Sequence, residues 1–194
     1  MSVLLYIHGF NSSPESHKAS ALKQWLAAQH PQISYEVPYL KPYPAESIAQ
    51  LGHIVERYKN KDETVGLMGS SLGGFYAAYL AEKYNLRVVL INPSIRPFEL
   101  LSEYIGENQN FYNKDRYLFE QKHVDELKQF FVPEHAHPEN LLLMVQTGDE
   151  ALDFKEATAK YTGSQNIIEY GGDHSFQQFE RWYDYTLHFL KLLA

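Results

Sequence analysis

Six short apolar runs, separated by longer stretches with helical periodicity, are the feature of this chain that most constrains its fold. The runs are Val3 to Ile7, Ile33 to Val37, Thr64 to Met68, Val88 to Ile91, Leu141 to Val145 and Ile167 to Tyr170. They are continuous rather than alternating, which is typical of parallel strands covered on both faces. Because strands that alternate with helices form βαβ units, the sequence predicts an α/β fold with a small, mainly parallel sheet of about six strands and helices on both faces.

The stretches between these runs carry helix signals. Ser13 and Pro14 have the residue types expected at an N-cap and at the first position of a helix. The alanine-rich and aromatic stretch from Leu72 to Tyr84 predicts a second helix. Other helices are expected over the remaining stretches of helical spacing, which are Ile48 to Tyr58, Asp153 to Tyr161 and Phe176 to Leu190.

A length of 194 residues fits a single domain over 1–194. Between Pro93 and Glu139 the sequence contains no convincing strand, and this connection is longer than an αβ loop needs. We interpret about 94–139 as a mostly helical cap insertion at the sheet edge. The alternative is an ordinary crossover helix with long loops, whose own small core holds Phe98, Tyr104, Phe111, Tyr112, Tyr117, Phe119, Phe130 and Phe131.

Composition excludes several classes of function. A net charge of −7 with no cluster of Lys or Arg disfavours nucleic acid as a partner. The absence of cysteine excludes a disulfide framework, a thiolate nucleophile and a thiolate zinc site. No apolar run reaches the ~18 residues of a membrane span, and the first run lacks the basic region of a signal peptide. We therefore expect a soluble, cytoplasmic protein, a monomer or small homo-oligomer.

The strongest chemical signal is Gly69-Ser70-Ser71-Leu72-Gly73, between a predicted strand and a predicted helix. It matches G-x-S-x-G, a sharp strand-to-helix turn that exposes a nucleophilic serine. Glycine is needed two residues either side of the serine because Cβ atoms there would collide in the strained turn. The context predicts that Ser71 is a nucleophile.

A serine hydroxyl needs a general base and an orienting acid, which follow the serine in this architecture in the order acid, then histidine. Asp149 comes directly after the strand Leu141 to Val145, at the sheet edge where open α/β sheets bind ligands. Its competitor, Asp153, is better placed to cap the next helix. His174 follows the last strand and is the predicted base, whereas its neighbour Asp173 points away from it.

Negative charge that develops on the substrate needs two backbone N–H donors. We assign these to Leu72, the residue after the nucleophile, and to Phe10, in the loop after the first strand. The His8 side chain in the same loop is interpreted as a hydrogen-bonding residue rather than a second base. Asn11, Phe111 and Tyr112 are candidate substrate-binding residues, because the rings of the insertion could shelter an apolar acyl chain.

No cofactor or metal is expected. Nucleotide-binding glycine motifs are absent from the sequence. Glutamate and histidine side chains can bind metal ions, and four of them lie close together in the sequence: Glu134, His135, His137 and Glu139. They lie beside prolines, however, in a segment that is typical of a polar loop.

These motifs together resemble the α/β-hydrolase superfamily, and within it the small bacterial YqiA-like esterases, over essentially the whole chain. The segments that carry the resemblance are Tyr6 to Pro14, Gly69 to Gly74, Gln146 to Glu150 and Gly171 to His174. The resemblance implies a serine esterase with Ser71, Asp149 and His174 as its triad and Phe10 and Leu72 as oxyanion donors. The expected substrate is a small acyl ester or thioester. The alternative is a partner-binding protein of this fold with weak or vestigial hydrolase activity.

Overall fold

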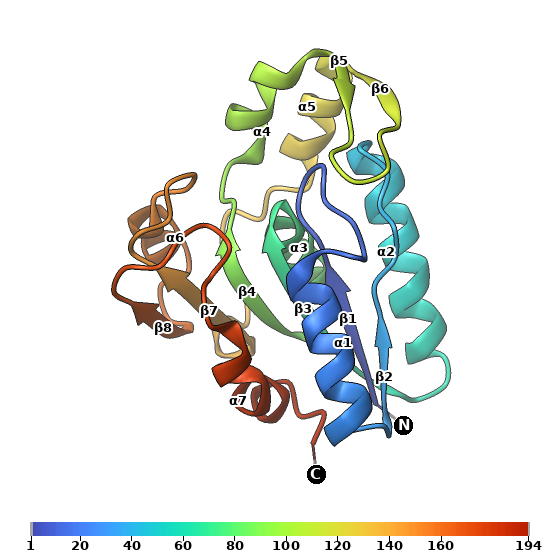
Figure 1. Ribbon diagram of the computed structural model, residues 1–194, viewed down its shortest axis with the longest axis vertical. Helices are drawn as coiled ribbons and strands as arrows, with labels where there is room; N and C mark the ends of the chain where they lie inside the picture. Colours follow the sequence, from blue (N-terminus) through green and yellow to red (C-terminus); the bar gives the residue numbers. More distant parts are fainter. Residues whose placement is uncertain (1, 194) are drawn as a thin grey trace.

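The computed structural model describes residues 2–193, which build a six-stranded sheet in the order β2-β1-β3-β4-β7-β8 (Figure 1). Each neighbouring pair of strands in this sheet is parallel. The strands are β1 (Ser2–Ile7), β2 (Ile33–Glu36), β3 (Thr64–Ser71), β4 (Arg87–Pro93), β7 (Leu141–Gln146) and β8 (Gln165–Glu169). All six predicted runs are strands of this sheet, and the α/β prediction is confirmed.

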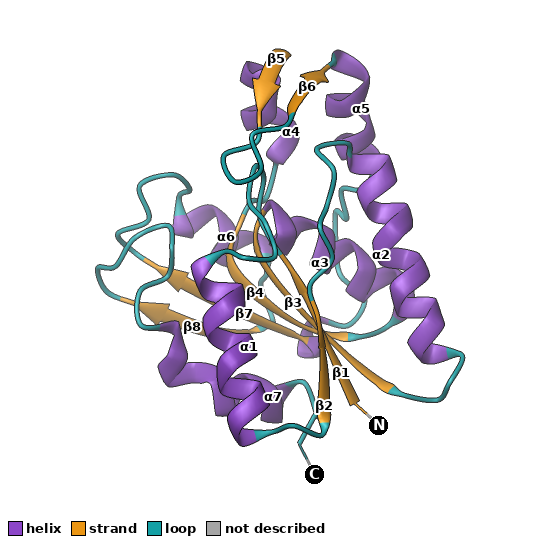
Figure 2. Ribbon diagram, turned by 45° about the vertical axis from the view of Figure 1, so that its right-hand side comes forward, coloured by secondary structure: helices purple, strands orange, loops and turns teal. Residues whose placement is uncertain are grey.

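Helices cover both faces of the sheet (Figure 2). One face carries α1 (His17–Gln29), the 3-10 helix η3 (Phe179–Trp182) and α7 (Tyr183–Phe189). The other carries α2 (Pro44–Lys59), α3 (Leu72–Tyr84) and α6 (Phe154–Lys160). Of the helices within residues 2–193, none has the length and apolar character to cross a bilayer.

The first strand shows why the apolar runs are continuous. Leu4 and Tyr6 point into the core beneath α1 and α7, whereas Val3, Leu5 and Ile7 point into the core beneath α2 and α3. Successive side chains of a strand alternate between faces, so a strand covered on both sides is apolar at every position.

Two predicted helix boundaries are wrong. The Ser13 hydroxyl accepts the Glu15 N–H at 3.0 Å in a turn, and α1 begins only at His17. At the other end, Phe176 precedes the final helix, although its side chain is buried as expected. Phe176 and Gln178 have φ values of 57° and 58°, which lie in the left-handed region and prevent a right-handed helix from starting before Phe179.

The insertion at 94–139 contains helices as predicted, but it also contains a β-hairpin that was not expected. Its elements are α4 (Pro97–Leu100), the 3-10 helix η1 (Leu101–Tyr104), β5 (Gly106–Gln109), β6 (Arg116–Phe119), α5 (Gln121–Gln129) and, at its end, the 3-10 helix η2 (Pro138–Asn140). Strands β5 and β6 pair antiparallel in a separate two-stranded sheet. The sequence hid this hairpin because β5 reads Gly-Glu-Asn-Gln, with no β-branched or aromatic residue to signal a strand.

Candidate active site

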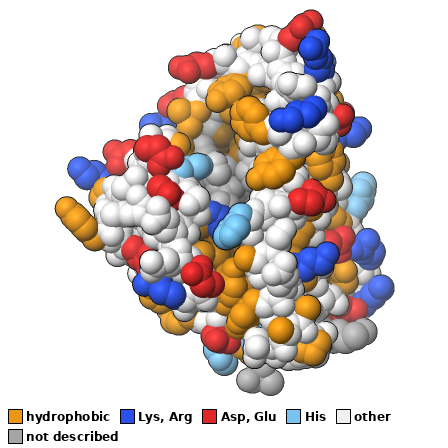
Figure 3. Space-filling model, in the orientation of Figure 1, with side chains coloured by type: hydrophobic (Ala, Val, Ile, Leu, Met, Phe, Trp, Pro, Cys, Tyr) orange, Lys and Arg blue, Asp and Glu red, His pale blue; other side chains and the backbone are white. Residues whose placement is uncertain are grey.

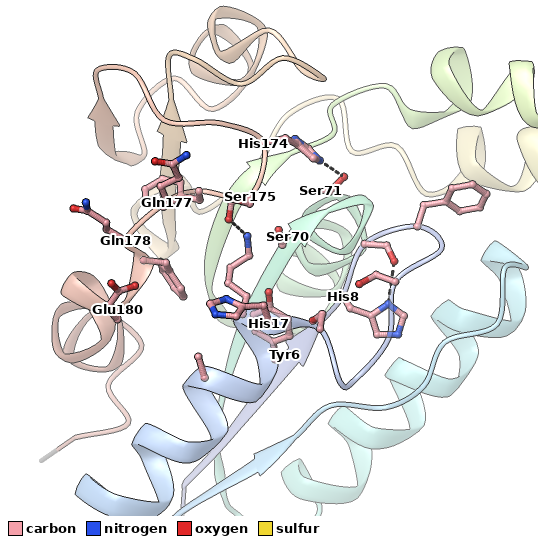
Figure 4. A pocket seen from close by; sticks show the side chains of 18 of the residues that line it. Tyr6, His8, His17, Ser70, Ser71, His174, Ser175, Gln177, Gln178 and Glu180 are labelled. Atoms are coloured by element: carbon pink, nitrogen blue, oxygen red, sulfur yellow. Dashed lines mark hydrogen bonds between the residues drawn. The ribbon is translucent and has the colours of Figure 1, made fainter. Parts of the chain in front are cut away.

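Ser71 stands at the junction of β3 and α3, in a strained backbone conformation. It is the last residue of β3, and α3 starts at the next residue. Its φ of 56° and ψ of −124° are rare for a residue with a side chain. The strained turn presents the Ser71 side chain toward His174 (Figure 4).

The two glycines of the motif are required by contacts with backbone atoms. A Cβ built on Gly69 would lie 2.2 Å from the Gly73 carbonyl oxygen. A Cβ on Gly73 would lie 2.0 Å from the carbonyl oxygen of Ile7, in β1. Both distances are far below van der Waals contact, so a larger residue at either position would displace the turn or the neighbouring strand.

His174 and Asp149 complete a continuous hydrogen-bonded chain with Ser71. His174 Nδ1 lies 2.9 Å from Asp149 Oδ2 and 3.0 Å from Oδ1, and His174 Nε2 lies 3.1 Å from Ser71 Oγ. An ionised carboxylate only accepts hydrogen bonds, so the Nδ1 atom of a neutral His174 carries the proton. The free electron pair of Nε2 therefore faces the serine hydroxyl.

Asp149 is held rigidly, and its two competitors have other partners. Its side chain is only 2% exposed, and Oδ1 also accepts the N–H groups of Ala151 and Leu152 at 2.9 Å. Asp153 instead caps α6 by accepting the Lys155 N–H. Asp173 accepts hydrogen bonds from Ser175 and Gln177. Of the three carboxylates, Asp149 is the one brought to His174.

Two buried amide side chains that the sequence analysis did not single out position the His174 loop. Asn92 Nδ2 donates to the carbonyl oxygens of Asp173 at 3.0 Å and His174 at 3.1 Å, and Asn92 Oδ1 accepts the Gln146 N–H. Gln146 Oε1 accepts the N–H groups of Asp173 and Gln177. The signal that could have found both is a polar residue directly after a buried apolar run.

The loop after β1 lies against Ser71. A Cβ built on Gly9 would lie only 3.2 Å from Ser71 Cβ, so Gly9 packs against the nucleophile. Phe10 is the next residue of this loop. Leu72 is the first residue of α3, where helical N–H groups have no partner within the helix. These are the two N–H groups that the sequence analysis assigned as donors.

His8 fixes this loop instead of facing the serine. Its Nε2 accepts the Leu40 N–H at 3.2 Å, and its Nδ1 lies 2.9 Å from the Gly9 carbonyl oxygen. Burial lowers the pKa of the His8 imidazole, partly opposed by the Gly9 carbonyl. A neutral ring with both nitrogens engaged holds the loop in place.

A cavity of about 690 Å³ opens beside Ser71 and His174, between the start of α1 and the segment that leads into α7. Figure 3 shows the corresponding hollow, with histidine side chains at its edges and apolar side chains gathered above it. The lining includes Tyr112 but not Phe111. Most of the labelled side chains around it in Figure 4 are polar.

The expectation for Phe111 needs correction. Phe111 is 67% exposed and lies outside the cavity. The reason is the turn at 110–115, in which the Asn110 side chain accepts the Tyr112 N–H and contacts the Ser12 carbonyl oxygen, leaving Phe111 outward. Asn11 also lies outside this cavity, and its Oδ1 accepts the Tyr117 hydroxyl at 2.7 Å.

The histidines at 135 and 137 do not converge. His135 Nδ1 lies 3.3 Å from Glu82, whereas His137 Nδ1 lies 3.2 Å from Glu139. Among residues 2–193, no three His, Cys, Asp or Glu side chains are grouped so that they could hold a metal ion.

Known proteins resemble this chain in sequence and in structure. YcfP of Escherichia coli is 26% identical over 110 residues, which cover 56% of this chain and 60% of YcfP, so the match spans less than two thirds of that relative. Est1E of Butyrivibrio proteoclasticus, solved with ferulic acid, has a TM-score of 0.74 at 15% identity, covering 99% of this chain and 89% of Est1E.

A monoacylglycerol lipase of Paleococcus ferrophilus has a TM-score of 0.66 at 15% identity, covering 97% of this chain and 93% of the lipase. These likenesses show that the chain has the α/β-hydrolase fold. The sequence profile of the uncharacterised protein family UPF0227 matches residues 3–191, and the chain therefore belongs to this family.

Proposed function

We propose that the protein is a serine hydrolase that cleaves carboxylic esters or thioesters through an acyl-enzyme. The observation that carries this proposal is the unbroken chain from Ser71 Oγ through the His174 ring to the buried Asp149 carboxylate, with links of 3.1 and 2.9 Å. The Ser71 end of this hydrogen-bonded series lies at a cavity large enough for a small ester.

In the first step, Ser71 Oγ attacks the substrate carbonyl carbon while His174 Nε2 accepts the hydroxyl proton. The imidazolium that forms is stabilised by the Asp149 carboxylate at Nδ1. The carbonyl π electrons move to the oxygen, which becomes an oxyanion. The N–H groups of Phe10 and Leu72 are the proposed donors to that oxyanion.

The intermediate then collapses. The bond from carbon to the leaving oxygen or sulfur breaks, and His174 returns its proton to the departing alcohol or thiol. Water next attacks the acyl-Ser71 ester while His174 accepts a water proton. The Ser71 ester bond then breaks, the carboxylic acid leaves, and His174 returns its proton to Ser71 Oγ, which restores the serine hydroxyl.

Two kinds of observation support an ester as the substrate. Est1E and the Paleococcus enzyme share the fold, and the second is a monoacylglycerol lipase. The close approach of Gly9 to the Ser71 side chain also supports the neighbouring Phe10 as one of the proposed oxyanion donors.

The test is a panel of p-nitrophenyl esters and acyl-thioesters of increasing chain length. We expect turnover by the unaltered protein and a loss of about 10⁴–10⁶-fold in kcat in Ser71→Ala. The matched control is Ser34→Ala, an exposed serine of β2. Turnover that is undiminished in Ser71→Ala would contradict the proposal.

A further inference from the structure

The cavity beside Ser71 contains a cationic side chain that the proposed reaction does not use. Lys18 lies in the first turn of α1. Among the described residues 2–193 that line the cavity, it is the only lysine, and no arginine lines the cavity. Its ammonium group donates to the carbonyl oxygen of Ser175, the residue after His174. Lys18 therefore places a positive charge near the proposed base.

This ammonium group has no carboxylate partner. Within the described residues, no Asp or Glu oxygen lies within 4.0 Å of Lys18 Nζ in an ion pair. The acids closest in the fold are already engaged: Asp173 with Ser175 and Gln177, and Asp149 with His174. Glu150, which also lines the cavity, accepts the His174 N–H at 3.0 Å.

The environment makes an unpaired charge costly. Burial is the main cause that lowers the pKa of Lys18 to about 8, although the negative charges of Asp173 and Asp149 act in the opposite direction. An ammonium has three donor hydrogens, and the Ser175 carbonyl takes one. Two donors and one charge remain for a ligand in the cavity.

We infer, on the basis of the proposed function, that the Lys18 ammonium binds a carboxylate group of the ester substrate. A single ammonium matches a single negative charge. A dianionic phosphate fits less well, because Glu150 and Glu180 also line the cavity and repel two negative charges more strongly than one. The carboxylate can belong to the acyl part or to the alcohol part of the ester, and the experiment distinguishes the two.

The experiment compares anionic esters with neutral esters of matched size. For the acyl part, the pairs are mono-p-nitrophenyl esters of succinate, glutarate and adipate against p-nitrophenyl esters of the corresponding monocarboxylic acids. For the alcohol part, the pair is the butyrate ester of 4-hydroxybenzoate against that of 4-hydroxybenzamide. Each pair yields a ratio of kcat/KM for the anionic over the neutral ester.

We expect one arm to show a ratio about tenfold in favour of the anion, the size of a charge-assisted hydrogen bond at a partly buried site. Lys18→Met should remove most of this preference, and Lys18→Arg should retain it. The matched control is Lys23→Met, an exposed lysine of the same helix outside the cavity. Because the ratio compares two esters on one enzyme, a general loss of activity cancels.

Two results would overturn this inference while leaving the proposed function intact. One is Ser71-dependent hydrolysis with no preference for the anionic ester in either arm. The other is a Lys18→Met variant that loses activity equally on both esters, which would make Lys18 a positioning residue for the His174 loop. Absence of any Ser71-dependent hydrolysis would overturn the proposed function and the inference together.

The pH dependence of the ratio provides an independent check. A lysine is charged below its pKa, so the preference for the anion should be full near pH 6.5 and should fall as the pH rises through about 8. In Lys18→Arg the preference should persist to pH 9, because guanidinium stays charged. The ratio cancels effects on the chemical step from the other titratable groups that face this region, which are Tyr6, His8, His17, Tyr112, Asp149, Glu150, Asp173, His174, Glu180 and Tyr183. A ratio that does not change between pH 6.5 and 9 in the unaltered protein would contradict the role of Lys18.

Discussion

The sheet edge that carries Ser71 and the insertion at 94–139 differ in how firmly they are built. At the edge, the buried Asn92 and Gln146 hold the His174 loop with several hydrogen bonds, and the backbone around Gly69 and Gly73 leaves no room for a Cβ. The insertion leaves large apolar side chains exposed, including Leu100, Tyr104, Ile105, Phe111 and Leu118. The side chains of Ser71, His174 and Asp149, which are joined by successive contacts of about 3 Å, come from the ends of strands or the loops after them. The insertion contributes part of the cavity wall.

The insertion packs against the site around the Phe10 ring. The Phe10 ring packs against Tyr104, Tyr117 and Phe119 with ring centroids 5.3, 6.4 and 5.9 Å away. Phe10 belongs to the loop whose N–H is a proposed oxyanion donor. The rings of the insertion therefore support this loop, and Tyr112 is the member that reaches the cavity.

The largest expected effect tests the sheet edge. Asp149→Asn should lower kcat by about 10⁴-fold with little change in stability, because an amide favours the wrong tautomer of His174. Asp153→Asn is the control, since asparagine caps a helix about as well as aspartate. Steady-state kinetics on one p-nitrophenyl ester measures both variants. A larger loss in Asp153→Asn would show that Asp149 is not the acid.

The second prediction separates the packed part of the insertion from its exposed part. Phe119→Ala should lower the free energy of unfolding by about 3–5 kcal/mol, because its fully buried ring leaves a cavity. Phe111→Ala should change it by less than about 0.5 kcal/mol, because that ring is mostly exposed. Urea denaturation measures both. Equal effects would mean that the insertion packs differently from the arrangement described.

The third and smallest effect concerns the loop that carries the base. Asn92→Ala removes the hydrogen bonds to the carbonyl oxygens of Asp173 and His174, so the imidazole loses its fixed position. We expect a fall in kcat of about 10²-fold, the cost of displacing a catalytic group by about 1 Å. Asn113→Ala, an exposed asparagine in the insertion, is the control. If both variants retain full kcat, Asn92 does not position His174.

Sequence alone was sufficient for the sheet, because burial on both faces makes each strand a continuous apolar run. It also identified Ser71, Asp149 and His174, since each lies within four residues of the end of a predicted strand and parallel strands end at one edge. The distances between them, and the burial of Asp149, depend on loop conformations that local sequence does not encode.

What sequence missed has particular physical causes. The hairpin of the insertion escaped because its strands are four residues long and β5 is polar. Phe111 was misplaced because residue type does not reveal which way a turn directs a ring. A polar residue directly after an apolar run marks Asn92 as a candidate, but its partners Asp173 and His174 lie more than 80 positions away, and the local pattern does not identify them.

The most direct test of the account is to locate the residue that a fluorophosphonate modifies. Ser71 should be labelled, and neither Ser71→Ala nor a protein treated with denaturant before labelling should react. Trypsin would release residues 62–83 with both Ser70 and Ser71, so fragmentation of this peptide must identify the modified serine. A single adduct on Ser71 is the predicted result. An adduct on Ser70, or undiminished labelling of Ser71→Ala, would contradict the account.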